Sequence, residues 1–166
     1  QAQAEASRCL QCDVLCNSCV TVCPNLAFYS YTVEPIQVGL QKITLLNESP
    51  VVEEDSIFTL TQPYQVLHIA DWCNECGNCT TFCPTADAPY LKKPHLYLSR
   101  DSFEACDNGY FYETETQTLL YKQKNRRYSI FRSADNYQFT DGDSTLILDS
   151  TTFRIIQFNM KGTKPI

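Results

Sequence analysis

Four cysteines with fixed spacing constrain this chain more than any other feature of its sequence. Cys73, Cys76, Cys79 and Cys83 are separated by two, two and three residues, and a proline follows the last of them. This is the spacing of the cysteine ligands of bacterial [4Fe–4S] clusters. In such runs the first three thiolates bind one cluster, and the fourth binds a second cluster. A chain with one such run is therefore expected to contain another.

A second run is present near the start of the chain. Cys16, Cys19 and Cys23 repeat the last two spacings, and Cys23 again precedes a proline. The next cysteine upstream, Cys12, is separated from Cys16 by three residues instead of two, and Cys9 lies further away. A loop can absorb one extra residue, so we favour Cys12 over Cys9 as the remaining ligand, although the spacing leaves both open.

The two reciprocal runs predict the ligands of two [4Fe–4S] clusters. One cluster would be bound by Cys12, Cys16, Cys19 and Cys83, and the other by Cys73, Cys76, Cys79 and Cys23. Because the ligands cross between the runs, we expect folding and metal binding to be coupled. Zinc also binds pairs of cysteines two residues apart, so a structural zinc-binding or protein-interaction domain is the alternative.

Few other residues suggest chemistry. Phe28, Trp72, Phe82 and Tyr90 flank the runs, where they would shield the clusters from water or pack in the core. The two histidines occur singly in strand-like segments, which favours core or surface roles over iron ligation. The sequence has no recognisable catalytic triad or phosphate-binding glycine loop, so no substrate site is visible and enzymatic activity is left open.

Charge is distributed unevenly along the chain. Between Cys9 and Tyr90 nine acidic residues oppose a single base, Lys42, which gives a net charge of −8. From Leu91 onward, eleven basic residues meet nine acidic ones. The acidic, cysteine-bearing part disfavours nucleic acid and favours a partner with a basic docking surface. Its negative charge also favours low reduction potentials for both clusters.

Cysteine usage also bears on the cellular compartment. Ten cysteines in 166 residues would suit a secreted disulfide scaffold, but nine of them fall in the two runs and no secretory signal precedes them. We therefore expect a cytoplasmic protein. No apolar run approaches the roughly 18 residues of a membrane-spanning helix, so membrane insertion is not expected. An alanine-rich helix over residues 1–8 is expected to continue from a larger polypeptide.

The long connector between the runs has the pattern of β-strands. Apolar and polar residues alternate over residues 30–46 and again over 65–69, and residues 57–60 form another apolar run. The acidic residues 53–55 are expected to form an exposed tip between strands.

The residues around the cysteines resemble known families. Residues 5–12 resemble the start of the iron–sulfur region of the glutamate synthase small-subunit group. Residues 23–25, 73–84 and 89–92 more closely resemble the C-terminal ferredoxin-like region of the putative selenate reductase subunit family. The resemblance implies an electron-transfer module of a larger oxidoreductase. It also implies FAD and NAD(P)H in upstream domains outside this chain, and a molybdenum-containing redox partner.

Together these observations predict an α+β fold class. Residues 1–94 would form a bacterial two-cluster ferredoxin-like module, with a β-hairpin inserted at about residues 30–70. Residues 95–166 contain short aromatic and β-branched runs separated by polar turns, which predicts a small antiparallel β domain.

The choice between Cys9 and Cys12 can be tested by iron analysis. The Cys9→Ser variant should retain about eight irons per chain, whereas Cys12→Ser should lose one cluster and retain about four. Iron content of the anaerobically purified variants measures this directly. The opposite pattern would make Cys9 the ligand.

Overall fold

The computed structural model of the chain describes residues 16–47 and 49–160. The chain divides into two compact units. The described part of the first unit comprises residues 16–34 and 62–96, and that of the second comprises 35–47, 49–61 and 97–160. The helix expected over residues 1–8 lies outside the described residues.

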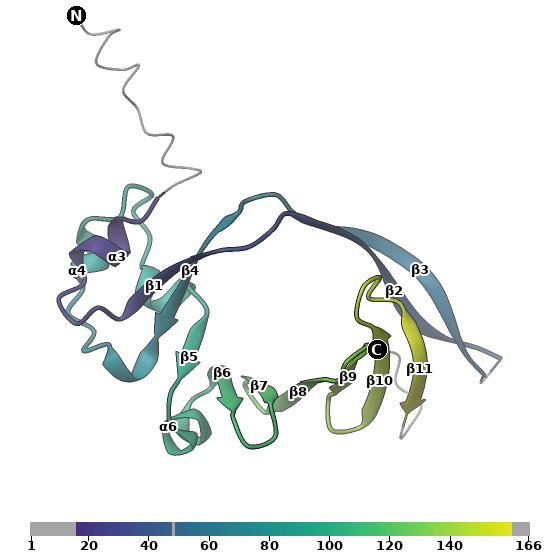
Figure 1. Cartoon of the computed structure of the whole chain (residues 1–166). Helices are drawn as coiled ribbons and strands as arrows, with labels where there is room; N and C mark the ends of the chain where they lie inside the picture. The colour runs from purple at the N-terminus through teal and green to yellow at the C-terminus, as the bar shows by residue number, and fades with distance from the viewer. Residues whose placement is uncertain (1–15, 48, 161–166) are drawn as a thin grey trace, which may run out of the picture. The chain divides into compact units, whose positions relative to one another are not determined.

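The first unit combines short strands with short helices (Figure 1). Strand β1 (Phe28–Thr32) pairs antiparallel with β4 (Tyr64–Ile69), and β4 pairs parallel with β5 (His95–Tyr97) through residues 95 and 96. The helices are α3 (Ser18–Val22), the 3-10 helix η1 (Ala70–Trp72), α4 (Asn78–Thr81) and α5 (Pro89–Lys92). A small buried cluster of Cys19, Phe28, Val66 and Cys79 joins α3 and α4 to β1 and β4.

Local backbone constraints keep the helices of the cysteine runs short. Cys23 ends α3 with φ −78° and ψ 112°, an extended conformation that a following proline imposes on the residue before it. Helix α4 begins directly after Gly77, whose φ of 79° is left-handed and suits a residue without Cβ. These helices are therefore only five and four residues long.

A long β-hairpin belongs to the second unit. Its strands β2 (Ile36–Leu46) and β3 (Ser49–Leu60) pair antiparallel around Asn47, which has a left-handed φ of 50°. The acidic residues 53–55 lie inside β3, so the expectation that they form a tip between strands is wrong. Side chains from β2 pair with two of these carboxylates. The Gln41 amide donates to Glu54 at 3.0 Å, and Lys42 lies 3.5 Å from Asp55.

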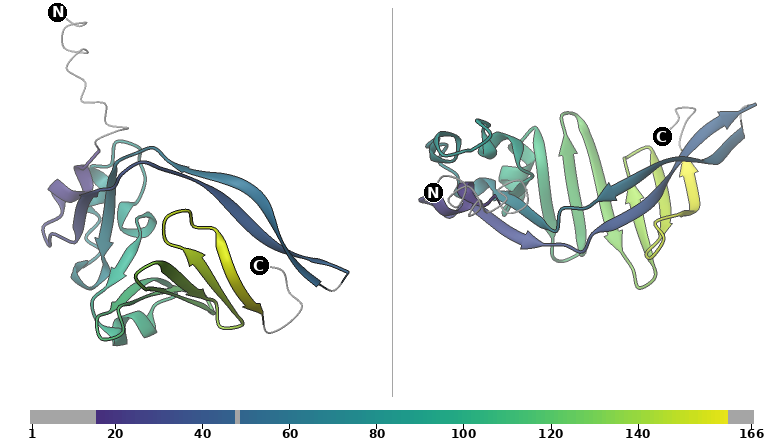
Figure 2. Two further views of the ribbon diagram at one scale, coloured as in Figure 1. Left: turned by 45° about the vertical axis from the view of Figure 1, so that its right-hand side comes forward. Right: turned by 90° about the horizontal axis from the view of Figure 1, so that it is seen from above.

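The rest of the second unit is an antiparallel meander. Its strands are β6 (Asn108–Glu113), β7 (Thr118–Gln123), β8 (Arg126–Arg132), β9 (Asn136–Thr140), β10 (Ser144–Asp149) and β11 (Ile155–Met160). Each pairs with the next strand in sequence, and Figure 2 shows them side by side. Neither β9 nor the helix α6 (Arg100–Ala105) that precedes the meander was expected from the sequence.

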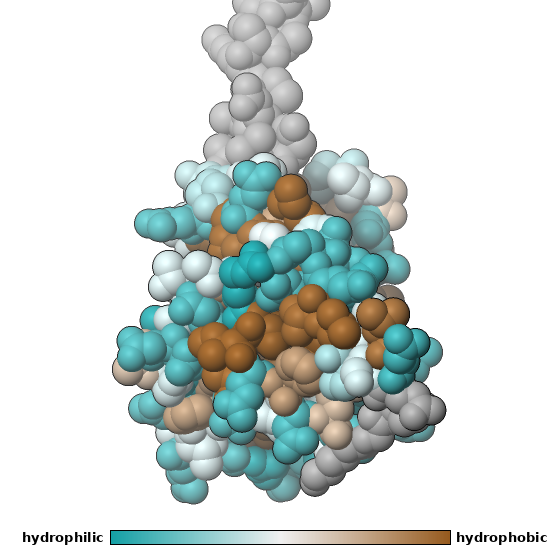
Figure 3. Space-filling view, turned by 90° about the vertical axis from the view of Figure 1, so that its right-hand side faces the viewer, coloured by the Kyte–Doolittle hydropathy of each residue, from teal (hydrophilic) through white to brown (hydrophobic). Residues whose placement is uncertain are grey.

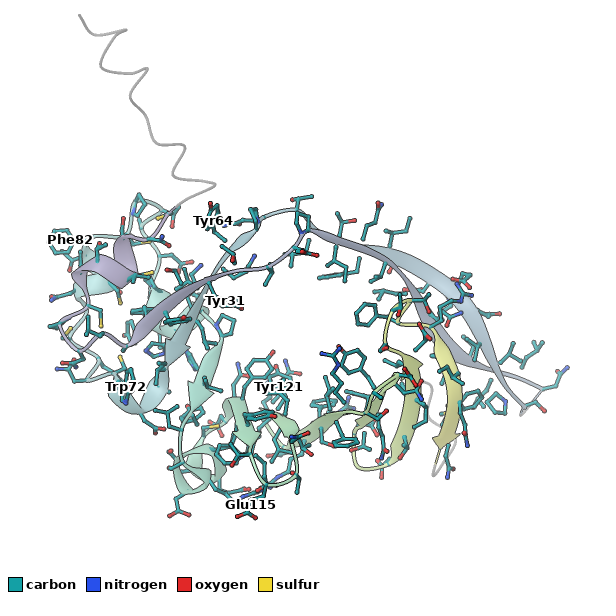
Figure 4. All side chains as sticks on the ribbon, viewed as in Figure 1. Tyr31, Tyr64, Trp72, Phe82, Glu115 and Tyr121 are labelled. Carbon is teal, nitrogen blue, oxygen red and sulfur yellow. The ribbon has the colours of Figure 1, made fainter. Side chains whose placement is uncertain are left out.

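Aromatic side chains organise one face of this meander. Tyr110, Tyr121, Tyr128 and Phe139 stack in turn across four strands, with ring centroids 4.5, 5.6 and 5.9 Å apart. Figure 4 places Tyr121 within this row. Cross-strand aromatic pairs of this kind stabilise neighbouring strands and fix their register.

Apolar side chains also reach the surface of the second unit. Figure 3 shows a band of them between hydrophilic residues on the side where β2, β3, β10 and β11 lie. Leu46, Ile57 and Ile156 are each more than half exposed. None of the helices in the described part of the chain has the length and apolar character needed to cross a membrane.

The strand content corrects the predicted fold class. Strands account for 51% of the structure and helices for 15%, so the fold is mostly β and does not fit an α+β ferredoxin-like module. The physical reason lies in both units. Proline and glycine limit the helices of the cysteine runs to about one turn, whereas the hairpin and the meander contribute long paired strands.

Helix α6 contacts the meander through a buried ring as well as through ion pairs of Arg100 with Glu113 and of Glu104 with Arg127. Phe103 is 1% exposed and stacks on Phe111 with a centroid distance of 5.7 Å. Phe103→Ala should lower the free energy of unfolding by about 3 kcal/mol, because it removes buried surface and leaves a cavity. Phe131→Ala is the matched control, since Phe131 is 38% exposed and should lose less than about 1.5 kcal/mol. Urea denaturation followed by far-ultraviolet circular dichroism would measure both, and equal losses would contradict the anchoring role of Phe103.

Candidate metal centre

Four of the predicted ligands line one recess of the first unit. Cys73 and Cys76 come from the segment between η1 and α4, Cys79 lies in α4, and Cys23 directly follows α3. The structure therefore brings the last cysteine of the first run together with the first three cysteines of the second run. We call this the Cys23 recess.

Three further predicted ligands line a second recess of the same unit. Cys16 and Cys19 come from the beginning of α3, and Cys83 follows α4. Here the last cysteine of the second run joins cysteines of the first. Cys9 and Cys12 lie outside the described residues. We call this the Cys83 recess.

Backbone amides donate hydrogen bonds to two sulfurs of the Cys23 recess. The N–H of Glu75 donates to Cys73 Sγ at 3.4 Å, and the N–H of Ala27 donates to Cys23 Sγ at 3.3 Å. Glu75 adopts a left-handed φ of 55°, which curves the backbone after Cys73. Such bonds stabilise thiolates and are one means by which a protein sets the potential of an iron–sulfur cluster.

Burial and neighbouring groups shift the thiol pKa values in opposite directions. Burial raises the pKa of Cys19 while the charge of Lys93 opposes this, and burial raises the pKa of Cys73 while the Glu75 N–H opposes it. The Thr85 hydroxyl lies 3.2 Å from Cys83 Sγ and holds the pKa of that thiol below its usual value. Metal binding requires the thiolate, so each group that lowers a thiol pKa favours coordination.

The donor set fits an iron–sulfur cluster. Among residues 16–47 and 49–160, no three His, Cys, Asp or Glu side chains are placed to share a single metal ion. The Cys23 recess does offer four cysteines and two amides directed at sulfur, which are the donors and hydrogen bonds that [4Fe–4S] clusters use. Cys23, Cys73, Cys76 and Cys79 are thus the residues that would hold a cluster here.

The aromatic residues near the runs divide into two pairs. Phe28, which is 5% exposed, and Tyr90 line the Cys23 recess. Trp72 and Phe82 are 49% and 60% exposed and line neither recess, so they do not pack in the core; shielding of a cluster by any of the four stays a prediction. Figure 4 shows Phe82 at the outer edge of the first unit.

A buried histidine lies behind the Cys23 recess. His68 is 3% exposed, with its ring centroid 4.8 Å from Phe28 and 5.0 Å from His95. Neither ring nitrogen of His68 has a hydrogen-bond partner in the described part of the chain. The imidazole of His95 instead lies 2.9 Å from the Tyr90 carbonyl oxygen, to which Nε2 donates. Burial, and then the neighbouring His95, lower the pKa of His68 to about 4.

Sequence reasoning missed several of these groups. The amides of Ala27 and Glu75 carry no signal in the sequence, because any residue offers an N–H. Lys92 and Lys93 line the Cys83 recess. In the sequence, however, the charges were summed separately before and after Tyr90, so both lysines were counted apart from the cysteine runs. The position of Thr85 two residues after Cys83 is the one local signal that could have been used.

Comparison with known proteins links the chain to oxidoreductases. Over 107 residues, 64% of its length, it is 34% identical to the protein named "Putative oxidoreductase YgfK" of Escherichia coli strain K12, and equally to the protein of that name from E. coli O157:H7. The chain spans only 8% of the length of these curated relatives. No protein-family model and no solved structure matches it.

The buried His68 predicts a loss of stability in mild acid. The unfolded imidazole takes up a proton near pH 6.5, whereas the folded one does so near pH 4. Between these values the unfolded state binds more protons, so the free energy of unfolding should fall as pH falls, by at most about 1.4 kcal/mol per pH unit. Urea midpoints at pH 7, 6 and 5 should therefore drop more for the wild-type protein than for His68→Leu. Parallel decreases in the two proteins would contradict this assignment.

Proposed function

We propose that this chain is an electron-transfer module that carries two [4Fe–4S] clusters within a larger oxidoreductase linked to flavin and NAD(P)H. The observation that carries the proposal is the Cys23 recess, where residues from both runs meet and backbone amides donate to sulfur. A bound cluster would supply one-electron transfer. Cys12, Cys16, Cys19 and Cys83 would hold one cluster, and Cys23, Cys73, Cys76 and Cys79 the other.

The placement of the two recesses suits transfer of an electron between them. Helix α3 leads from Cys19 in the Cys83 recess to Cys23 in the Cys23 recess. Helix α4 leads back, from Cys79 in the Cys23 recess to Cys83 in the Cys83 recess. Four residues of helix rise by about 6 Å. Cys19 and Cys79 also belong to the same buried cluster. Only two short helices therefore separate the recesses.

Free thiols, low exposure to water and hydrogen bonds to sulfur favour metal binding in the recesses. Every described cysteine is a free thiol, so none is withdrawn into a disulfide. Phe28 and Tyr90 reduce access of water to the Cys23 recess, and lower water exposure is one of the factors that set a cluster potential. The amides of Ala27 and Glu75 and the hydroxyl of Thr85 stabilise sulfur in its anionic form.

The wider assignment rests on sequence similarity. The curated relatives are far longer than this chain, which leaves room in such a protein for flavin- and nucleotide-binding domains. FAD, NAD(P)H, a molybdenum-containing partner and a selenate-reductase-like reaction belong to the proposal through the family resemblance of the cysteine segments. A cytoplasmic location belongs to it as well, since these thiols must stay reduced to bind metal.

Metal and sulfide analysis tests the proposal against the zinc alternative. Anaerobically purified protein should be brown, contain about eight irons and eight acid-labile sulfides per chain, and bleach with dithionite. Cys76→Ser should lose about half of the iron. Cys106→Ser is the matched control, because Cys106 lines neither recess and its loss should leave the iron content unchanged. A colourless protein that contains stoichiometric zinc and no labile sulfide would contradict electron transfer and support a structural zinc site.

A further inference from the structure

We propose that Trp72 and Leu26 form a docking surface beside the Cys23 recess, where a separate redox protein with a basic surface exchanges one electron with the centre in that recess. The inference rests on the proposed function, in which the Cys23 recess holds a [4Fe–4S] cluster. We call these two side chains, together with the loop of residues 74–78 that lines the recess, the Trp72 patch.

The Cys23 recess opens to solvent through this loop. Residues 74–78 all line the recess, and all of them except Gly77 are exposed. Among the ligands, Cys79 is only 6% exposed, whereas Cys76 belongs to the exposed loop. An electron from another protein would therefore reach the centre most directly at this side of the first unit.

The two apolar side chains flank the recess from different segments of the chain. Trp72 directly precedes the first ligand of the second run. Leu26 lies in the turn after Cys23, and its N–H donates to the Cys23 carbonyl at 3.2 Å. The Ile69 N–H donates to the Ala27 carbonyl at 2.7 Å, which holds the segment before Trp72 beside the segment after Leu26. The fold thus brings both side chains to one side of the unit.

Both side chains expose much of their apolar surface. Leu26 is 72% exposed and Trp72, the single tryptophan of the chain, is 49% exposed. Tryptophan is highly buried on average in folded proteins, and at interfaces it is enriched among the residues that contribute most to binding. The exposure of Trp72 next to a ligand therefore favours a role in contacting a partner.

The small size of the Trp72 patch indicates what kind of partner it contacts. Weak electron-transfer encounters bury less than about 1,200 Å² in total, whereas permanent interfaces are larger and more apolar. The Trp72 patch offers two large apolar side chains next to a loop that includes the polar residues Asn74, Glu75 and Asn78. It suits a separate protein that binds briefly and dissociates after transfer.

Charge indicates the chemistry of the partner's surface. The exposed Glu75 lines the Cys23 recess, and no Lys or Arg among the described residues lines it. Carboxylates beside a contact surface attract a positively charged partner and speed the encounter, and salt weakens this effect. We therefore expect a partner surface that combines an apolar centre with Lys or Arg side chains.

Stopped-flow oxidation of the reduced protein by ferric cytochrome c, a small basic haem protein, tests the inference. One electron leaves the reduced cluster and converts ferric haem to ferrous haem, and no atom is transferred. Trp72→Ala should lower the second-order rate constant about tenfold, because it removes an apolar anchor of the encounter. Glu75→Gln should lower the rate constant and weaken its dependence on salt.

Three controls separate docking from damage to the cluster. Trp72→Phe keeps an aromatic ring and should retain most of the rate. Tyr112→Ala is the matched control, because Tyr112 is 48% exposed but belongs to the second unit, and this variant should react like the wild-type protein. Reduction of each oxidised variant by reduced methyl viologen, a small reagent that needs no docking surface, should proceed at the wild-type rate.

Several outcomes would overturn the inference and leave the proposed function intact. These are an unchanged rate constant in Trp72→Ala, an equal loss in Tyr112→Ala, or a matching loss in the viologen reaction of Trp72→Ala. An equal or larger loss in Phe82→Ala would also overturn it, because Figure 4 shows Phe82 and Trp72 at opposite ends of the first unit. Wild-type protein without any reducible cluster would instead contradict the proposed function, and the inference with it.

Discussion

The crossing of two cysteine runs is the constraint on which the first unit depends. Each run ends in a cysteine followed by proline, and in the first run the residue before the proline, Cys23, is extended and ends α3. The last cysteine of each run then reaches the recess formed by the other run. The buried apolar cluster that joins the two helices is small, and two of its members are cysteines. Besides the pairing of its short strands, this unit therefore has little apolar packing of its own.

The second unit is stabilised on a different physical basis. Strand pairing between sequence neighbours and the stacked row of Tyr110, Tyr121, Tyr128 and Phe139 fix its meander. Its hairpin is joined to the last strand by an ion pair between Glu54 and Arg154 and by the Ile155 N–H, which donates to the Gln41 side chain at 2.9 Å. The second unit is thus held by strand pairing and aromatic stacking, whereas the first unit has only a small apolar cluster.

Position in space, and not position along the chain, decides where charge acts. The whole protein carries −6, and the sequence from Cys9 to Tyr90 is strongly acidic. Folding nevertheless places Lys92 and Lys93 beside one set of cysteines and Glu75 beside the other. Acidic residues 53–55, which contributed to that negative sum, belong to the second unit. A uniform acidic field is therefore a poor description of the surroundings of the two recesses.

The sequence by itself determined which cysteines to consider and how the two runs cross, because covalent spacing limits which thiolates can share a cluster. It also indicated most of the strands, since alternation reports which face of a strand is buried. It could not determine whether strands or helices predominate, because the number of helical residues depends on where backbone restrictions end each helix. The tertiary structure alone decided that Phe28, and not Phe82, lines a recess, and which amides donate to sulfur. It also decided which charges lie beside each recess, because these are long-range contacts that no local pattern encodes.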